Sequence, residues 1–411
     1  MRKQVILLLV FSLISLPNQK TYAAIPTAGA TCTKVGLIQI YKSKKYTCVR
    51  LKGKVVWNKG VKLIPLTPSP TPFSSPASTD IIAARIYKFF DSTNGFQGVY
   101  LKKLNDGVIA DFQSTLAFDP ASSLKALVAL YVFDQAVNGK LNLLDEFPSI
   151  SSGNPHGCSP SKTNTRESFE TAIKLMMQVS DNDRTTALIS HFGAFRLNSF
   201  ARSIGLANTS FKITTDALGF NPFGCVDPFV NKVNPLSVSG NFSTLQNLTR
   251  IWELASALPQ PFRQQFMNLT AGREMSDNQG YDFTGIWPAL QRIVLEEAPA
   301  TLERVKLDKY IQLMRSNTKG GSNALCFKTE NCTTVRWWVS MISLTSIPIC
   351  DANGVINLDT YVWGYFSANA DSASTIYDVN NPAIRGFIKI GAEPMREQIH
   401  KSLENFGQCK L

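Results

Sequence analysis

Three short motifs in this chain have the residue types needed for acyl transfer to a serine. They are Ser122-Ser123-Leu124-Lys125, then Ser180-Asp181-Asn182, and then Lys319-Gly320-Gly321. A serine hydroxyl is a weak nucleophile at its ordinary pKa, so it needs a neighbouring base. A lysine three residues later on a helix lies on the same face, which brings the Lys125 amine within reach of the Ser122 proton. The first motif therefore predicts a nucleophile and its base.

The residues around the first motif predict a helix. Asp119 can cap its N-terminus, and Pro120 suits the first helical position. Apolar residues follow at helical spacing: Leu124, Leu127, Leu130 and Tyr131. Ser122 would lie in the first turn, where backbone N–H groups and the helix dipole favour developing negative charge. Ser123 has no lysine at the same spacing.

Each motif alone is a weak signal, because short patterns recur by chance. The segments 159–162 and 316–319 also place a lysine three residues after a serine, and residues 276–278 repeat Ser-Asp-Asn. A capping or surface serine is the usual explanation of a single match. The order of the three motifs and their surroundings favour a shared site.

With these motifs, the chain resembles the superfamily of class A β-lactamases and penicillin-binding D,D-peptidases, in which S-x-x-K, S-D-N and K-T-G occur. The resemblance covers residues 80–411. Residues 98–101 and 107–110 look like that fold's opening hairpin, residues 138–145 like the turn after the nucleophile helix, and residues 176–182 like the helix end before S-D-N.

The resemblance implies an α/β (α+β) fold, a three-layer sandwich with helices on both faces of an antiparallel sheet and an additional helical lobe. Strands are predicted near residues 97–103 and 107–112, before the nucleophile helix, and near 335–344 and 359–367, after the third motif. A final helix is predicted near residues 395–406.

The resemblance also implies a role for the first two motifs. Ser122 would attack a β-lactam or a D-alanyl-D-alanine amide of a peptidoglycan stem peptide, while Lys125 takes its proton. Ser180 would pass a proton to the leaving nitrogen, and Asn182 would bind the amide of the substrate's side chain.

The third motif would bind the substrate. Lys319 would hold the substrate carboxylate, and the backbone N–H groups of Ser122 and Ser322 would form the oxyanion hole. Gly320 and Gly321 would let the substrate backbone approach the strand closely.

The third motif departs from the pattern of the superfamily, because Gly320 replaces a threonine whose hydroxyl helps to bind the carboxylate. Arg336 on the next predicted strand is either a bidentate partner for that carboxylate or an ordinary exposed arginine. A rival motif at residues 328–330, Lys-Thr-Glu, would place a carboxylate against an anionic substrate, so Lys319 is preferred.

A second departure concerns deacylation. Class A enzymes carry a glutamate that activates the deacylating water, but no glutamate lies between Asn208 and Thr244. The carboxylates of that segment are Asp216 and Asp227, and neither has the family's E-x-x-L-N surroundings. Acylation is therefore expected to survive better than hydrolysis of the acyl-enzyme. The alternative is a cell-wall-binding protein that has kept the fold without the chemistry.

The N-terminal residues 1–24 are predicted to be a secretory signal peptide, with basic Arg2 and Lys3, an apolar run over residues 5–16, and small residues at Ala23 and Ala24. The protein is then expected to be secreted or associated with the cell wall, with no transmembrane segment after processing.

The positive charge is concentrated near the N-terminus. Residues 1–63 hold 12 of the 42 lysines and arginines and none of the 30 aspartates and glutamates, so this segment accounts for the net charge of +12. Residues 25–63 are expected to form a small β-rich module with a Cys32–Cys48 disulfide, worth about 3 kcal/mol by loop entropy. Its basic surface either binds an anionic cell-wall polymer or is simply solvated. Nucleic acid is a poor candidate for an exported chain.

Residues 64–79 are rich in proline, serine and threonine and are predicted to be a linker to the domain at residues 80–411. Eight cysteines in an exported chain suggest four disulfides, for which the further plausible pairs are 326–332, 158–225 and 350–409. No metal or other cofactor is expected, since the chain lacks C-x-x-C and has three histidines. Of these, His191 is expected to end a helix, which argues against a Ser-His-Asp triad.

Overall fold

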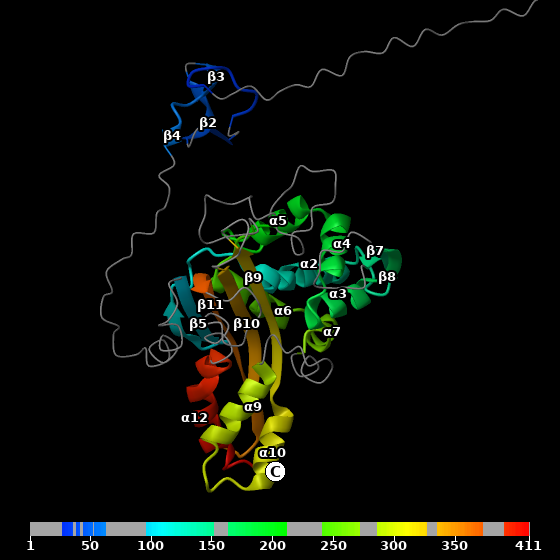
Figure 1. The fold of residues 1–411 in the computed structure, drawn as a ribbon, viewed down its shortest axis with the longest axis vertical. Coiled ribbons are helices and arrows are strands. Elements are labelled where there is room, and N and C mark those ends of the chain that lie inside the picture. The colour runs from blue at the N-terminus through cyan, green and yellow to red at the C-terminus, as the bar shows by residue number, and fades with distance from the viewer. Residues whose placement is uncertain are drawn as a thin grey trace, which may run out of the picture. The chain divides into compact units, whose positions relative to one another are not determined.

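The computed structural model describes residues 27–35, 38–41, 44–51, 53–62, 96–151, 163–211, 241–271, 286–326, 335–372 and 390–410. The chain divides into two compact units, Met1–Ser75 and Pro76–Leu411 (Figure 1). The predicted signal peptide and linker lie outside the described residues. No helix of the described segments has the length and apolar character needed to cross a membrane.

The first unit is built on a long central strand. Strand β2 (Lys44–Leu51) pairs antiparallel with β1 (Ile38–Tyr41), β3 (Lys54–Trp57) and β4 (Val61–Lys62). The predicted disulfide between Cys32 and Cys48 is confirmed, and it ties the preceding loop to β2. Such a covalent link suits a unit too small to bury a large apolar core.

The second unit is organised around a five-stranded antiparallel sheet with strand order β6-β5-β11-β10-β9. The strands are β5 (Phe96–Lys103), β6 (Gly107–Phe112), β9 (Arg315–Cys326), β10 (Val335–Cys350) and β11 (Ile356–Ser372). A separate pair, β7 (Glu146–Ser151) and β8 (Thr163–Ser168), lies beside the helical lobe (Figure 1). The predicted antiparallel sheet is confirmed.

Helices cover both faces of this sheet. One face and the helical lobe have α2 (Lys125–Val137), α3 (Phe169–Gln178), α4 (Asn182–Phe192), α5 (Ala194–Ser203), α6 (Leu245–Ser256) and α7 (Phe262–Leu269). The other face has α9 (Ile286–Glu297), α10 (Arg304–Leu313) and α12 (Arg396–Phe406), which follows the short turn η2 (Glu393–Met395). Each face of the sheet has its own apolar core: the first core lies on the side of α2 and α6, and the second core on the side of α9 and α12. Because side chains alternate along a strand, Ile342 packs in the first core and Met341 in the second. The predicted three-layer fold and final helix are confirmed.

Strands β10 and β11 are longer than the sequence predicted. β10 continues to Cys350 because Ile347 and Cys350 still pack in the second core. Its pairing with β9 ends at Ser346, so Pro348 lies where β10 pairs with β11 alone. Proline lacks an N–H donor, and such a position tolerates it.

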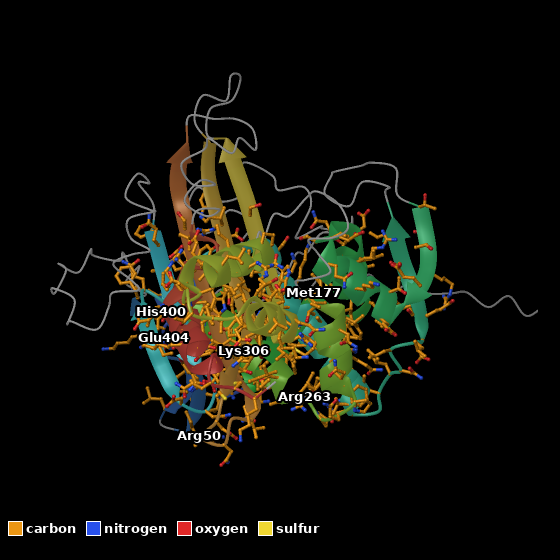
Figure 2. The ribbon with its side chains drawn as sticks, turned by 90° about the horizontal axis from the view of Figure 1, so that it is seen from below. Arg50, Met177, Arg263, Lys306, His400 and Glu404 are labelled. Atoms are coloured by element: carbon orange, nitrogen blue, oxygen red, sulfur yellow. A yellow bond between two sulfur atoms is a disulfide. The ribbon has the colours of Figure 1, made fainter. Side chains whose placement is uncertain are left out.

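The C-terminal helix α12 is held by charged groups. Lys306 on α10 donates to the carbonyl oxygens of Gly407 and Cys409, at 2.6 and 3.3 Å. One turn apart on α12, the side chains of His400 and Glu404 approach to 3.4 Å (Figure 2). A lysine at the C-terminal end of a helix satisfies carbonyl groups that have no partner within the helix.

The predicted disulfide between Cys350 and Cys409 is wrong, because both residues are buried free thiols. Burial and a hydrogen bond with Cys350 raise the pKa of the Cys409 thiol to about 12. An even cysteine count cannot distinguish two hydrogen-bonded thiols from a disulfide, since both place the residues side by side. The other two proposed pairs involve side chains outside the described part of the chain.

Candidate active site

Ser122 lies in a tight turn at the junction of the sheet and the helical lobe. The turn η1 (Ala121–Leu124) is a 3₁₀ helix that leads directly into α2, so the prediction that Ser122 occupies the first α-helical turn is wrong. Ala121, the first residue of η1, has φ +46°, a left-handed conformation that is rare for a residue with a side chain. The Asp119 carboxylate accepts a hydrogen bond from the Ala121 N–H at 2.9 Å and so stabilises this turn.

The Ser-Asp-Asn motif forms the junction between α3 and α4. Asp181 caps α4 by accepting from the Arg184 N–H at 3.0 Å, and Asn182 is the first residue of that helix. Ser180 has φ +56°, which is rare for a residue with a side chain. The sharp junction directs the motif toward Lys125.

The amine of Lys125 lies among the polar groups of the second motif. Its Nζ donates to the carbonyl oxygen of Ser180 at 2.6 Å, to Ser180 Oγ at 3.1 Å and to Asn182 Oδ1 at 2.7 Å. The Lys125 side chain is fully buried. The structure therefore brings the first two motifs together.

The third motif completes this group of residues from β9. Lys319 Nζ donates to Ser180 Oγ at 3.0 Å and to the Gly320 carbonyl oxygen at 3.0 Å. Lys319 is 2% exposed. The hydroxyl of Ser180 thus lies between two buried lysine amines, which belong to motifs 194 residues apart in the chain.

Burial strongly perturbs both lysines. Desolvation lowers the pKa of Lys319 to about 7. Desolvation also lowers the pKa of Lys125 well below its ordinary value, and the charge of Lys319 lowers it further, whereas Asp181 raises it. A lysine that loses its proton near neutral pH can act as a general base.

Gly321 brings β9 against the nucleophile turn. A Cβ atom at this position would lie 2.5 Å from both the Pro120 carbonyl oxygen and the Ser122 backbone nitrogen, and 2.7 Å from the Ser123 nitrogen. All three are backbone atoms, which cannot swing aside as a side chain would. Only glycine therefore allows this approach, which places the backbone before Ser322 next to the N–H of Ser122.

The remaining sequence predictions have mixed outcomes. Arg336 pairs with Leu325, three residues beyond Ser322 along β9, or about 10 Å at the usual strand rise. Its side chain lies outside the described part of the structure, so its role stays a prediction. The segment 316–319 lies on β9, where a spacing of three residues directs side chains to opposite faces, so it forms no second nucleophile–base pair. The rival motif at residues 328–330 is outside the described residues.

His191 lies in the last turn of α4, as predicted. Its ring packs against aromatic rings with centroids 4.7–5.5 Å away: Phe147, Phe169 and Phe192. Burial lowers the pKa of His191. These contacts describe a packed helix end.

Sequence reasoning missed Ser340, which binds the nucleophile turn from β10, and it gave Ser123 no role. A serine inside the apolar run of β10 was the available signal.

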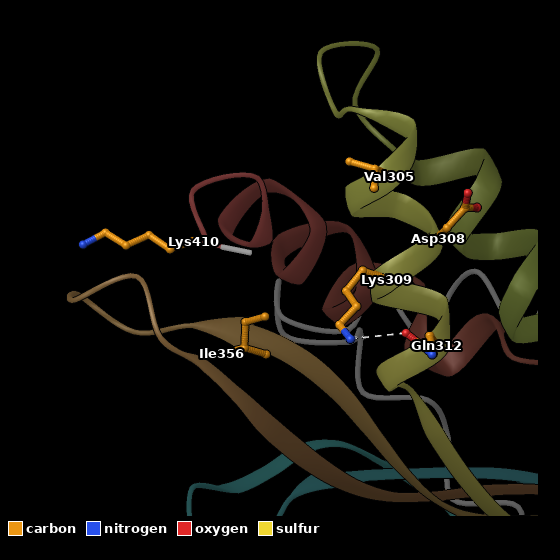
Figure 3. A pocket seen from close by; sticks show the side chains of 6 residues that line it. All are labelled: Val305, Asp308, Lys309, Gln312, Ile356 and Lys410. Atoms are coloured by element: carbon orange, nitrogen blue, oxygen red, sulfur yellow. Dashed lines mark hydrogen bonds between the residues drawn. The ribbon is translucent and has the colours of Figure 1, made fainter.

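An open hollow elsewhere, between α10 and the start of β11, contains none of the motif residues; it is lined by Val305, Asp308, Lys309, Gln312, Ile356 and Lys410 (Figure 3).

Two of three comparisons with known proteins find matches for this chain. The family described as "Beta-lactamase enzyme family" matches residues 81–277, which include the first two motifs. The structure of a class A β-lactamase from Bacteroides cellulosilyticus DSM 14838 matches with 16% identity and a TM-score of 0.50, over 79% of this chain and 100% of that chain. The TLA-1 extended-spectrum β-lactamase matches with 15% identity and a TM-score of 0.51, over 78% and 100%. The comparison with curated proteins finds no match.

At these identities the structural matches show the fold alone, which is that of class A β-lactamases. Together with the family match over residues 81–277, they support the resemblance predicted from the motifs: the second unit has the fold of class A β-lactamases, and part of it matches the β-lactamase enzyme family.

Proposed function

We propose that the protein is an exported serine hydrolase that forms an acyl-enzyme on Ser122 with β-lactams or D-alanyl-D-alanine-type amides, and that it deacylates slowly. The observation that carries this proposal is the position of the Ser180 hydroxyl, 3.1 Å from the Lys125 amine and 3.0 Å from the Lys319 amine. This arrangement supplies both a base and a route for its proton.

In the acylation step, Ser122 Oγ attacks the carbonyl carbon of the amide and its proton passes to the neutral Lys125 amine. The carbon–nitrogen bond then breaks as the Ser180 hydroxyl gives its proton to the leaving nitrogen. Lys125, in hydrogen-bond contact with Ser180, returns a proton to it. Lys125 ends the step neutral, and the substrate carbonyl carbon is bonded to Ser122.

Lys319 has two roles in this proposal. In its protonated form it attracts a substrate carboxylate, and the same charge lowers the pKa of Lys125. The N–H groups of Ser122 and Ser322 stabilise the oxyanion, and the close approach at Gly321 supports that pairing. Asn182, whose Oδ1 accepts from Lys125, has its amide NH₂ as a donor for the substrate.

The cost of burial argues against a protein that only binds cell wall. Two buried amines next to one another are expensive to desolvate, and their charges repel. A protein that only binds a carboxylate requires the charge of Lys319 but does not require a neutral Lys125. A general base explains why both lysines are buried.

The first unit is proposed to hold the enzyme on an anionic cell-wall polymer. Its described basic side chains are exposed: Lys34, Lys44, Arg50, Lys54 and Lys59. Residues 1–63 contain no acidic residue to neutralise them. The mature protein should cosediment with purified cell walls at low salt and be released at high salt. Replacing these five basic residues with uncharged ones should abolish cosedimentation, and unchanged binding would refute the proposal.

Intact-protein mass spectrometry tests the enzymatic proposal. The mature chain and a Ser122→Ala variant are exposed briefly to benzylpenicillin, and the adduct is followed over hours. The proposal expects an adduct of the intact drug mass on the wild type alone, persisting for hours. Absence of the adduct would favour the wall-binding alternative, and rapid turnover of the drug would refute slow deacylation.

A further inference from the structure

A closed ring of hydrogen bonds joins the nucleophile turn to the sheet. The Pro120 carbonyl oxygen accepts from the Ser123 N–H at 3.0 Å and from the Ser340 hydroxyl at 3.0 Å. The hydroxyls of Ser123 and Ser340 are 2.8 Å apart. The ring therefore runs from the Ser123 N–H to Pro120, on to Ser340 and back to the Ser123 hydroxyl.

A count of donors limits the arrangements of the protons to those in which each hydroxyl makes one bond as donor. Each hydroxyl has one proton. When Ser340 gives its proton to the Pro120 carbonyl, the Ser123 hydroxyl is the donor to Ser340 Oγ. When Ser340 donates to Ser123 Oγ instead, Ser123 donates to the Lys319 carbonyl oxygen. The Lys319 carbonyl oxygen, 3.1 Å from Ser123 Oγ, is a second acceptor within reach. Both side chains are buried, at 1% and 0% exposure, so water does not compete for these bonds.

This ring surrounds the strained part of the turn. Ala121, with its left-handed φ, lies between Pro120 and Ser122, and such a conformation persists only where its surroundings hold it. Asp119 holds the Ala121 N–H on one side, and Ser340 holds the Pro120 carbonyl on the other. On the sheet side, Gly321 lies directly opposite Ser340 in the strand register.

We propose that Ser340 and Ser123 are positioning residues that set the separation between the Ser122 N–H and the backbone of β9. This inference rests on the proposed function, because that separation is the width of the proposed oxyanion hole. The two donors must both reach one oxygen at hydrogen-bond distance, so a small change in separation weakens one of them. Neither hydroxyl has to touch the substrate.

The test compares Ser340→Ala and Ser123→Ala with Ser343→Ala. Ser343 is a matched control, because it is a fully buried serine on the same strand, and its hydroxyl bonds within the described residues go to strand residues, at Ser316, Asn317 and Thr345. Ser340→Ala is expected to fold, since the Ser123 hydroxyl keeps the Lys319 carbonyl as acceptor and Pro120 keeps the Ser123 N–H.

Three readouts separate positioning from a general loss of stability. Ser340→Ala should slow acylation by benzylpenicillin about tenfold or more, as expected from weakening one oxyanion donor. The infrared carbonyl band of its acyl-enzyme should move to higher wavenumber, because a weaker oxyanion hole polarises the ester less. Hydrogen exchange at the Ser123 amide should accelerate severalfold. Ser343→Ala should change neither the acylation rate nor the carbonyl band, whatever its melting temperature.

Wild-type acylation and an unshifted carbonyl band in Ser340→Ala would overturn the inference. So would slowed acylation that Ser343→Ala reproduces at equal loss of melting temperature. A wild-type protein that no penicillin acylates would refute the proposed function instead. In that case hydrogen exchange at the Ser123 amide still tests whether Ser340 positions the nucleophile turn, since an unchanged exchange rate in Ser340→Ala would show that it does not.

Discussion

The substitution Gly321→Ala should cripple acylation while leaving the fold intact. The added Cβ would lie 2.5 Å from two backbone atoms of the nucleophile turn, whereas ordinary contacts begin near 3.4 Å. The strand and the turn must therefore separate by about 0.9 Å, the scale at which misplacement of reacting groups costs roughly a hundredfold in rate. Overpacking of this kind also costs about 1–3 kcal/mol of stability.

The assay is the second-order rate constant for acylation by a fluorescent penicillin, measured together with thermal unfolding. Gly407→Ala is the matched control, because its Cβ would meet no atom closer than 3.6 Å and its backbone φ is −53°. The control should acylate at the wild-type rate. Wild-type acylation by Gly321→Ala would refute the inference that β9 and the nucleophile turn are held at their closest approach.

Three further predictions concern charge. The acylation rate should fall as pH rises above about 7, because Lys319 loses the charge that attracts the substrate carboxylate; a profile flat from pH 6 to 9 would contradict this role. Because the folded pKa of Lys319 lies below its unfolded value of 10.5, the unfolded state binds more protons, and stability should rise with pH. Chemical denaturation should show a rise from pH 7 to 9 that is about 2 kcal/mol larger in the wild type than in Lys319→Met, and equal slopes would be inconsistent with a buried amine. Arg396→Ala should destabilise the fold by about 1–3 kcal/mol at pH 7, because Arg396 contacts Glu296, Glu297 and Glu393. Since the hydrogen bond with Arg396 lowers the pKa of Glu296, the loss should be smaller at pH 4, and equal loss at both pH values in denaturant titrations would argue against charge as the cause.

Which residues meet at the candidate site was predictable from the family resemblance that the three motifs carry, whereas local spacing alone linked only Ser122 to Lys125. Ser180, Lys125 and Lys319 converge as the resemblance implied. The short strands at residues 97–103 and 107–112 were also predictable, since their apolar residues and turn lie close together in the chain. These strands depend on local patterns, whereas the convergence of the motifs does not.

The features that were missed depend on tertiary contacts. The left-handed Ala121 turned the expected first helical turn into a 3₁₀ turn, and alanine gives no local sign of such a conformation. Ser340 binds a carbonyl 220 residues earlier in the chain, and no sequence period links the two. The state of Cys350 and Cys409 likewise depends on the chemistry of two neighbouring sulfurs, which their count does not reveal.

The central claim is that Ser122 is the residue acylated. The most direct measurement is tandem mass spectrometry of peptides from the protein trapped with benzylpenicillin, which locates the modified side chain. The adduct is expected on Ser122, and no adduct is expected when Lys125 is replaced by alanine, because the serine then lacks its base. An adduct on Ser123, Ser180 or any other residue would contradict the central claim.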